Sequence, residues 1–363
     1  MASACPDIPV VVLPANNVVH CATRPAAPVE AALTATTDAL TGLRARLLDP
    51  AGADDSAVRR ALDTAVERAA HLAAEAAVTP LDTTGLRAIV PNHDYFGVRT
   101  AAVDDAYRVA ETTVVLARVL ADLRGARLDL NDQAAEVRAM ILLLDGLLPP
   151  DGAPAPAPVS SYRPQLDLGK SELTRWVITH HFYFVLNLAA AHAVGRAVAA
   201  LADADRSTAV TAFREAAVLV RGFTAAMMHS GDMSAPCYDA RVRPSMYPPA
   251  VPAALTGRTQ PEHKAFRKAM RRLAATSTEP FAKIAVTDPE LALARDALFE
   301  ADLHDIERHI VVTAALVGDD SSIIQVDESA ESAIAILRTM RHTRAMAYRH
   351  LMRFGDQVEI ADA

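Results

Sequence analysis

Apolar residues recur three or four positions apart along most of the chain, with charged residues between them. The stretches "VEAALTATTDALTGLRARLL" (29–48) and "SAVRRALDTAVERAAHLAAEAA" (56–77) show this pattern clearly. Such a repeat is typical of amphipathic helices. It predicts helices at about 29–48, 56–77, 100–125, 131–148, 171–202, 207–229, 260–278, 289–317 and 328–354.

Start signals support two of these helices. "TQPE" (259–262) has the Thr-x-x-Glu spacing of a capping box, and "DPE" (288–290) predicts Asp288 as an N-cap with proline in the first helical position. The first 27 residues show no helical period. We expect them to wrap the surface or to lie along a groove.

Two proline-rich segments interrupt the helical pattern. Residues 149–169 hold six prolines, too many for a helix or a central strand, and residues 229–258 hold five. The first segment predicts a division into an N-terminal helical region (1–150), a Pro-rich linker (151–170) and a C-terminal helical domain (171–363). The second segment is a long loop rich in aromatics, methionines and arginines, which indicates a functional role.

The composition favours an all-α fold, because good helix formers are abundant while aromatics make up only 5% of the chain. A net charge of −8 argues against nucleic-acid binding. Three scattered cysteines do not suggest a disulfide framework, and no uninterrupted apolar run of about 20 residues suggests a membrane span. We therefore expect a soluble, cytoplasmic protein with no membrane partner.

The stretch "RWVITHHFYFVLNLAAAH" (175–192) places His180 and His181 side by side in an apolar helix. At 100° per residue the two side chains point in different directions. His181 and His192 share a face but lie three turns apart, so they cannot bind one metal ion. One interpretation is that both are hydrogen-bonded core residues; the other is that one of them faces a pocket.

Part of this helix, "VITHHFYFVL" (177–186), resembles the distal-pocket helix of the haem-dependent aromatic oxygenase superfamily, which includes tryptophan 2,3-dioxygenase, indoleamine 2,3-dioxygenase, the pyrrolnitrin-type rearrangement enzyme and haem tyrosine hydroxylases. The resemblance implies that His180 is the distal histidine above the iron. His181 stands where the family has glutamine, and Phe184 where it has glutamate. Tyr183 keeps the family's aromatic residue. We take all four as candidate catalytic or substrate-binding residues.

A second segment, "DMSAPCYDARVRPSMYPPAVPAALTGR" (232–258), is similar to the superfamily's substrate-binding region. Tyr238 and Arg243 carry the resemblance, and Arg258 matches an arginine that binds the substrate carboxylate. The planar fork of arginine suits that task, because it forms two parallel bonds to a carboxylate. The alternative is that both arginines cap helix ends or pair with nearby aspartates.

A third segment, "AIAILRTMRHTRAMAYRHLMRF" (333–354), looks like the C-terminal helix that carries the proximal haem ligand. The resemblance implies His342 as the iron ligand, with His350 in reserve. It also implies that arginines of this helix neutralise the haem propionates, or else form an exposed basic face. The candidates are Arg338, Arg341 and Arg349, with Arg344 and Arg353 on the same helix.

Together the three segments imply a helical bundle of the indoleamine/tryptophan dioxygenase type that binds haem b in its C-terminal domain. The expected function is oxygenation, with O₂ or peroxide, of an aromatic amino acid or an indole-derived substrate in secondary metabolism. A homodimer is compatible with this expectation. The loops that close over tryptophan in the two dioxygenases have no counterpart here, which favours a tyrosine-type hydroxylase as the alternative.

Two further alternatives belong to other classes. One is a non-catalytic helical protein that binds haem or a protein partner. The other is a di-iron oxidase, for which "ADLHDIERHIV" (301–311) offers the closest motif, although its histidine and glutamate stand in the reverse of the usual order.

Overall fold

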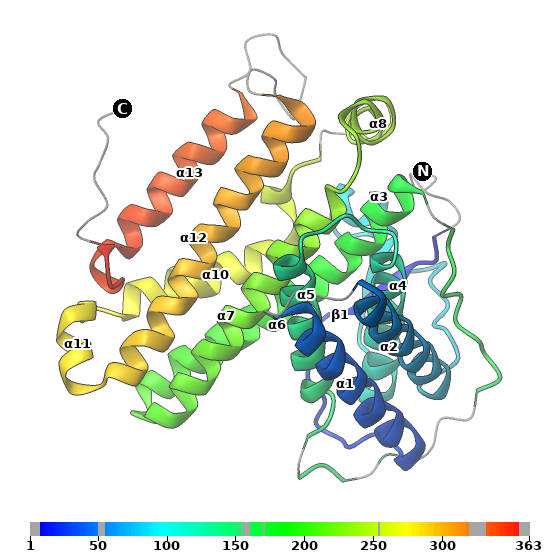
Figure 1. The fold of residues 1–363 in the computed structure, drawn as a ribbon, viewed down its shortest axis with the longest axis horizontal. Coiled ribbons are helices and arrows are strands. Elements are labelled where there is room, and N and C mark those ends of the chain that lie inside the picture. Colours follow the sequence, from blue (N-terminus) through cyan, green and yellow to red (C-terminus); the bar gives the residue numbers. More distant parts are fainter. Residues whose placement is uncertain are drawn as a thin grey trace.

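The fold of the computed structural model is all-α, as predicted (Figure 1). The structure describes residues 8–49, 55–149, 151–153, 155, 160–169, 171–252, 255–318 and 332–355. Its longer helices are α1 (Ala27–Leu47), α2 (Asp55–Glu75), α4 (Asp105–Leu123), α5 (Leu130–Gly146), α6 (Glu172–Ala202), α7 (Arg206–Ser230), α10 (Pro261–Thr276), α12 (Pro289–Val317) and α13 (Ala333–Tyr348).

Short elements connect these helices. They are α3 (Pro91–Tyr95), α8 (Ala235–Cys237), the π-helical turn η1 (Tyr238–Val242), α9 (Arg243–Ser245), the 3₁₀ turn η2 (Gly257–Thr259), α11 (Phe281–Thr287) and the 3₁₀ turn η3 (Arg349–Leu351). The loop predicted at 229–258 is thus largely a series of single turns. The helix predicted at 328–354 is described from residue 333 onward and changes to 3₁₀ geometry at Arg349.

The N-terminal segment does more than wrap the surface. Residues Val11–Pro14 form a buried strand, β1, that pairs in parallel with β2 (Val98–Ala101). Gly97 precedes β2 with φ of +64°, a left-handed conformation that glycine adopts without steric cost and that turns the chain from α3 into the strand. The strand pair therefore fixes the chain on either side of α3.

The helices α6 and α7 form the centre of the fold, with α4 and α10 packed against α6 and with α5 and α12 against α7 (Figure 1). The helix α6 has the length and apolar composition of a membrane span, the only one among the described residues to do so, but 67% of its most apolar window is buried inside the protein. Packing in the core therefore accounts for its apolar composition.

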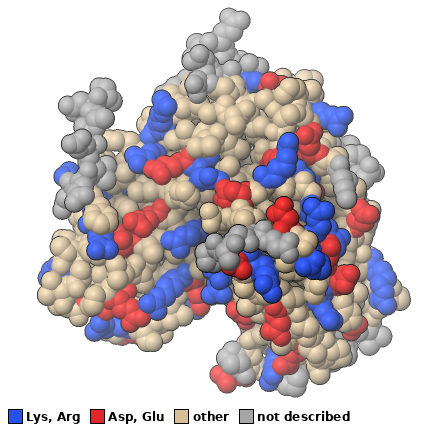
Figure 2. Space-filling model, viewed as in Figure 1, with Lys and Arg blue, Asp and Glu red and all other residues tan. Residues whose placement is uncertain are grey.

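One contiguous cluster of buried residues extends from Ile8 to Leu351. It includes residues on both sides of the Pro-rich segment at which a domain boundary was predicted, so the two parts of the chain share a core. On the face shown in Figure 2, acidic and basic side chains are interspersed.

Both predicted helices begin within about one residue of the expected position, but only one of the two predicted N-cap side chains is confirmed and the other is wrong. The carboxylate of Asp288 caps α12 by accepting a hydrogen bond from the backbone N–H of Leu291 at 3.2 Å. At α10 the N-cap residue is Gln260 and no side chain caps it. The hydroxyl of Thr259 instead contacts the side-chain oxygen of Asn92 at 2.8 Å, which ties the start of α10 to α3.

Candidate functional site

A cavity of about 670 Å³ lies between α6, the end of α7, α10, α12 and α13, with the segment from Tyr238 to Gln260 along one side. Its size falls within the range of small-molecule and cofactor sites. Much of the wall is apolar, and Phe96, Trp176, Met246, Ile306, Leu316, Leu337 and Met340 belong to it. The titratable side chains in the wall are His180, Tyr183, Tyr238, His263, Asp305, His309 and Arg344.

The imidazole of His180 lines the cavity from α6. Its Nδ1 donates a hydrogen bond to the carbonyl of Trp176, one helical turn earlier, at 2.6 Å. The ring stacks on Phe96, with 4.4 Å between ring centroids and 15° between planes, and also contacts the Trp176 ring at 4.2 Å. Because Nδ1 carries the proton, Nε2 keeps a lone pair for a ligand or a metal.

His181 has a different position. It is 1% exposed and is not part of the cavity wall, and its Nε2 donates to the carbonyl of Phe96 at 2.6 Å. Burial lowers the pKa of His181 to about 3, so the ring is neutral. The interaction joins α6 to the turn after α3. Of the two predicted catalytic histidines, the structure thus brings His180 to the cavity and places His181 in the core.

Tyr183 lies one turn further along α6 and lines the same cavity. Its hydroxyl is 3.3 Å from Nδ1 of His263, which belongs to the first turn of α10. This contact fixes one nitrogen of His263 and leaves the other for a ligand. Burial raises the pKa of the Tyr183 phenol, so it remains protonated at neutral pH.

Three histidines therefore share the cavity, because His309 of α12 lines it together with His180 and His263. Burial lowers the pKa of His180 to about 4, that of His263 to about 3 and that of His309 to about 4. The electrostatic effect of His309 adds to the lowering of the pKa at both other rings. All three are neutral at physiological pH, the form of imidazole that binds metals.

A carboxylate and a guanidinium also face the cavity. Oδ2 of Asp305 on α12 lies 3.9 Å from Nη1 of Arg344 on α13, and Oδ1 of Asp305 accepts a hydrogen bond from the Thr224 hydroxyl at 3.0 Å. Burial raises the pKa of Asp305 to about 6, although Arg344 opposes the rise. The Arg344 guanidinium also contacts the fully buried Asp302 at 3.3 Å.

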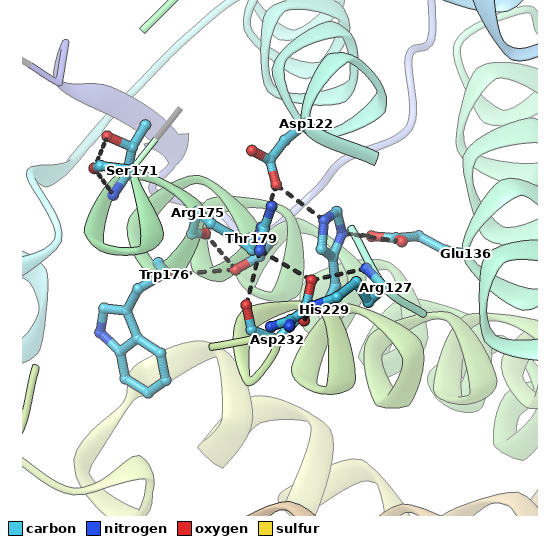
Figure 3. A network of polar contacts seen from close by, with 10 residues as sticks. Asp122, Arg127, Glu136, Ser171, Arg175, Trp176, Thr179, His229 and Asp232 are labelled. Atoms are coloured by element: carbon cyan, nitrogen blue, oxygen red, sulfur yellow. Dashed lines mark hydrogen bonds and ion pairs between the residues drawn. The ribbon is translucent and has the colours of Figure 1, made fainter. Parts of the chain in front are cut away.

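A network of charged groups joins α4, α5, α6 and α7 (Figure 3). The imidazole of His229 on α7 contacts Asp122 of α4 and Glu136 of α5, while Arg175 of α6 bridges Asp122 and Asp232. The Trp176 ring points away from these charges in Figure 3, and it belongs to the cavity wall. The network holds together the helix ends from which Trp176, Ser230 and Gly231 reach the cavity.

The predicted substrate-binding residues occupy different places. Tyr183 and Tyr238 line the cavity, whereas Phe184 is fully buried beside it and Arg243 pairs with Asp239 at 3.1 Å outside it. Arg258 belongs to the 3₁₀ turn Gly257–Thr259, whose two other residues line the cavity, and its side chain lies outside the described part of the structure.

Of the residues predicted on the C-terminal helix, Arg344 lines the cavity and the two histidines do not. His342 and His350 are exposed, as are Arg338 and Arg349, and Arg341 pairs with Glu307 at 2.7 Å. The face of α13 that lines the cavity carries Ala333, Ile336, Leu337, Met340 and Arg344. A helix turns 200° between Met340 and His342, so the His342 ring points away from that face.

His263 and His309 line the cavity but were not among the site residues predicted from the sequence. His309 and Asp305 belong to the segment 301–311, which was considered for a di-iron site, and they lie one turn apart on the cavity face of α12. Within the described ranges, no three His, Cys, Asp or Glu side chains come together in a group that could hold a metal ion.

A model of the family described as SfmD 3-methyl-L-tyrosine peroxygenase matches residues 17–294, well over half of the chain. The chain belongs to this family. The matched span includes His180 and His263 and ends before Asp305 and His309. The chain is also 30% identical over 263 residues to the 3-methyl-L-tyrosine peroxygenase of Streptomyces lavendulae, an alignment that covers 67% of this chain and 69% of that protein.

A solved structure, the crystal structure of reduced SfmD soaked with sodium hydrosulfite, is 21% identical to this chain. The alignment covers 80% of this chain and 97% of the SfmD chain, with a TM-score of 0.45.

Membership of the peroxygenase family confirms the prediction that the chain is an oxidoreductase. The named relative acts on an aromatic amino acid of the tyrosine type. The specific kinship with tryptophan and indoleamine dioxygenases, an indole substrate and a homodimer all stay predictions.

Proposed function

We propose that the chain is a haem-dependent peroxygenase that hydroxylates the ring of a tyrosine-type amino acid. The observation that carries the proposal is the cavity, which brings three neutral imidazoles into one largely apolar chamber in a member of this family. In the overall reaction an aromatic C–H bond and hydrogen peroxide give a phenolic C–OH and water, so oxygen and hydrogen balance without a further reductant.

The cavity residues fit a haem by their chemistry. A haem needs a neutral imidazole with a free ring nitrogen, apolar surroundings and exclusion of bulk water. We keep His180 as the residue on the reacting side, as first predicted. His309 and His263, which face the cavity from α12 and α10, are then the residues that would hold the haem iron in place of His342 and His350.

When bound, the haem iron would supply the redox chemistry that cleaves the O–O bond of peroxide. The protein residues position the reactants. The rings of Phe96 and Trp176 hold His180 in place, and Nε2 of His180 can accept a proton from peroxide or from the substrate phenol. The apolar side chains of α12 and α13 exclude water and pack against the flat ring of the substrate.

The proposal is tested by the absorption spectrum of the purified protein. A strong Soret band should be present and should change in His309→Ala or His263→Ala but not in His342→Ala or His350→Ala. Fluorescence gives a second readout, because the single tryptophan of the chain, Trp176, lines the cavity and a bound haem should quench it. Loaded protein should convert 3-methyl-L-tyrosine and peroxide to a product one oxygen heavier.

Protein that stays colourless with haem supplied would refute the cofactor. A Soret band lost only in the His342 variant would refute the assignment of the ligand.

A further inference from the structure

Among the described side chains, the cavity wall carries one anion and one cation, and the two do not fully neutralise each other. Asp305 and Arg344 both line the cavity, and their nearest charged atoms are 3.9 Å apart, beyond hydrogen-bond distance. Within the described residues, the hydrogen bond to the Asp305 carboxylate comes from the Thr224 hydroxyl and goes to Oδ1. Its Oδ2 therefore has room for a further donor from the cavity.

The surroundings of Arg344 make it a fixed cation. Its Nη1 contacts both the carboxylate and the backbone carbonyl of Asp302 at 3.3 Å. Asp302 is itself held by Arg267, at 2.5 and 2.7 Å, and by the Tyr348 hydroxyl at 2.8 Å. The buried cluster thus contains two guanidinium groups and one carboxylate apart from Asp305, which leaves positive charge available on the cavity side.

Two kinds of ligand could meet these charges. A purely anionic group, such as a carboxylate of a cofactor, would be attracted by Arg344 but repelled by Asp305. A cationic amine would be attracted by Asp305 but repelled by Arg344. A ligand that carries an ammonium and a carboxylate on neighbouring carbon atoms can satisfy both side chains at once.

We infer that Asp305 and Arg344 form the binding site for the α-amino acid group of the substrate, in which Asp305 accepts hydrogen bonds from the ammonium and Arg344 donates to the carboxylate. The inference rests on the proposed function, because it specifies how that cavity selects a free amino acid. Burial raises the pKa of Asp305 even though Arg344 lies 3.9 Å away, so a further cation such as the ligand ammonium would stabilise the anionic form.

The site explains why two charged residues persist in a largely apolar chamber. A buried carboxylate whose cation lies beyond hydrogen-bond distance is costly, and a bound ammonium would reduce that cost. The other cavity residues, including the three histidines, then remain available to contact the aromatic ring of the substrate and the cofactor. Arg258 and Arg243 are then not needed for the substrate carboxylate.

The test compares three ligands by isothermal titration calorimetry with the protein as purified. They are 3-methyl-L-tyrosine, its deaminated analogue, which lacks the ammonium, and its decarboxylated analogue, which lacks the carboxylate. Asp305→Asn should weaken binding of the amino acid and of the amine at least about tenfold and leave the deaminated acid unchanged or tighter. Arg344→Lys should weaken the amino acid and the acid but not the amine.

Glu307→Gln is the matched control. Glu307 lies on α12 two residues after Asp305 and pairs with Arg341 of α13 at the surface. Its substitution also removes an acid–arginine pair between the two helices, and it should leave all three affinities unchanged. If Arg344→Lys fails to fold, the Asp305→Asn variant decides alone, because its effect must depend on the ammonium.

Equal weakening of all three ligands by Asp305→Asn, or no change for any of them, would overturn the inference. These outcomes are ligand affinities, and they do not depend on whether the protein turns over its substrate. Protein that lacks haem and oxidises nothing, yet shows the expected ligand pattern, would contradict the proposed function and retain the amino acid site. Protein that oxidises 3-methyl-L-tyrosine without this pattern would support the proposed function and contradict the amino acid site.

Discussion

The Nε2 atom of His229 lies 3.1 Å from Oδ2 of Asp122, in a position where the His229 side chain has no exposure to solvent. A Glu136 carboxylate oxygen lies 3.2 Å from the other ring nitrogen. Burial alone would lower the pKa of His229, but the two carboxylates outweigh it and raise the pKa to about 9. The network in Figure 3 is therefore centred on a buried imidazolium ion.

This ion pair predicts a pH-dependent stability. The folded-state pKa of His229 is above its unfolded value of 6.5, so its contribution is complete below about pH 6.5 and is lost as pH rises through about 9. His229→Gln should lower the free energy of unfolding by about 3 kcal/mol at pH 6, because it removes the cation from the buried Glu136 and one of the two cationic partners of Asp122, which keeps Arg175. The difference from wild type should shrink between pH 6 and pH 9 in urea denaturation. A difference that does not vary with pH would show that His229 is neutral in the folded protein.

Substitutions of the two neighbouring histidines should have different effects, one mainly on stability and the other mainly on product formation. His181→Leu leaves the buried carbonyl of Phe96 without its donor and should cost about 1–3 kcal/mol of stability. His180→Leu should cost about 1 kcal/mol or less, because the carbonyl it contacts belongs to a continuous helix. It should nevertheless abolish product formation while Trp176 still reports ligand binding. Thermal unfolding and product analysis of both variants check this, and the opposite pattern would contradict the assignment.

Close packing of two helices at Gly222 gives a third prediction. A Cβ atom at Gly222 of α7 would lie 2.2 Å from the Cβ of Ala139 on α5, so Gly222→Ala should destabilise the protein by about 1–3 kcal/mol. The matched control is Gly195→Ala on α6, where nothing lies within 4 Å. That substitution should stabilise the protein by about 0.5–1 kcal/mol, since alanine favours the helix. Equal changes in melting temperature for the two variants would exclude a steric effect.

The buried carboxylate of Asp302 supports a fourth prediction. Asp302→Asn leaves Arg267 in the core without its counter-ion and Arg344 with Asp305 alone, and we expect a loss of about 3–5 kcal/mol. Tyr348→Phe removes one hydrogen bond to the same carboxylate and should cost about 1 kcal/mol. Glu307→Gln, at a partly exposed pair, should stay within about 1 kcal/mol of wild type. Denaturant titration ranks the three variants, and a different order would refute the central role of Asp302.

The fold was largely predictable because the helical repeat records which face of each helix is buried. The strand pair β1 and β2 was not, since each strand has four residues and the two are far apart in the sequence. Local pattern contains no information about such a pairing. The capping box at 259–262 failed because Thr259 found a partner in Asn92, on another element.

The candidate site was predictable where a polar residue interrupts an apolar helix, as at His180. His263 and His309 stand among charged residues, so their stretches looked like solvent-exposed faces. Their burial results from tertiary packing. His342 was chosen by resemblance, although its position relative to the apolar residues of α13 already placed it on the opposite face.

Phe96 offers its carbonyl to His181 and its ring to His180. The two interactions restrict the choice of amino acid at position 96 to different degrees. Any amino acid supplies the carbonyl, whereas only an aromatic one supplies the stacking surface. A descendant that lost the chemistry but kept the fold would therefore be expected to retain histidine at 181 while position 96 drifted among aliphatic residues.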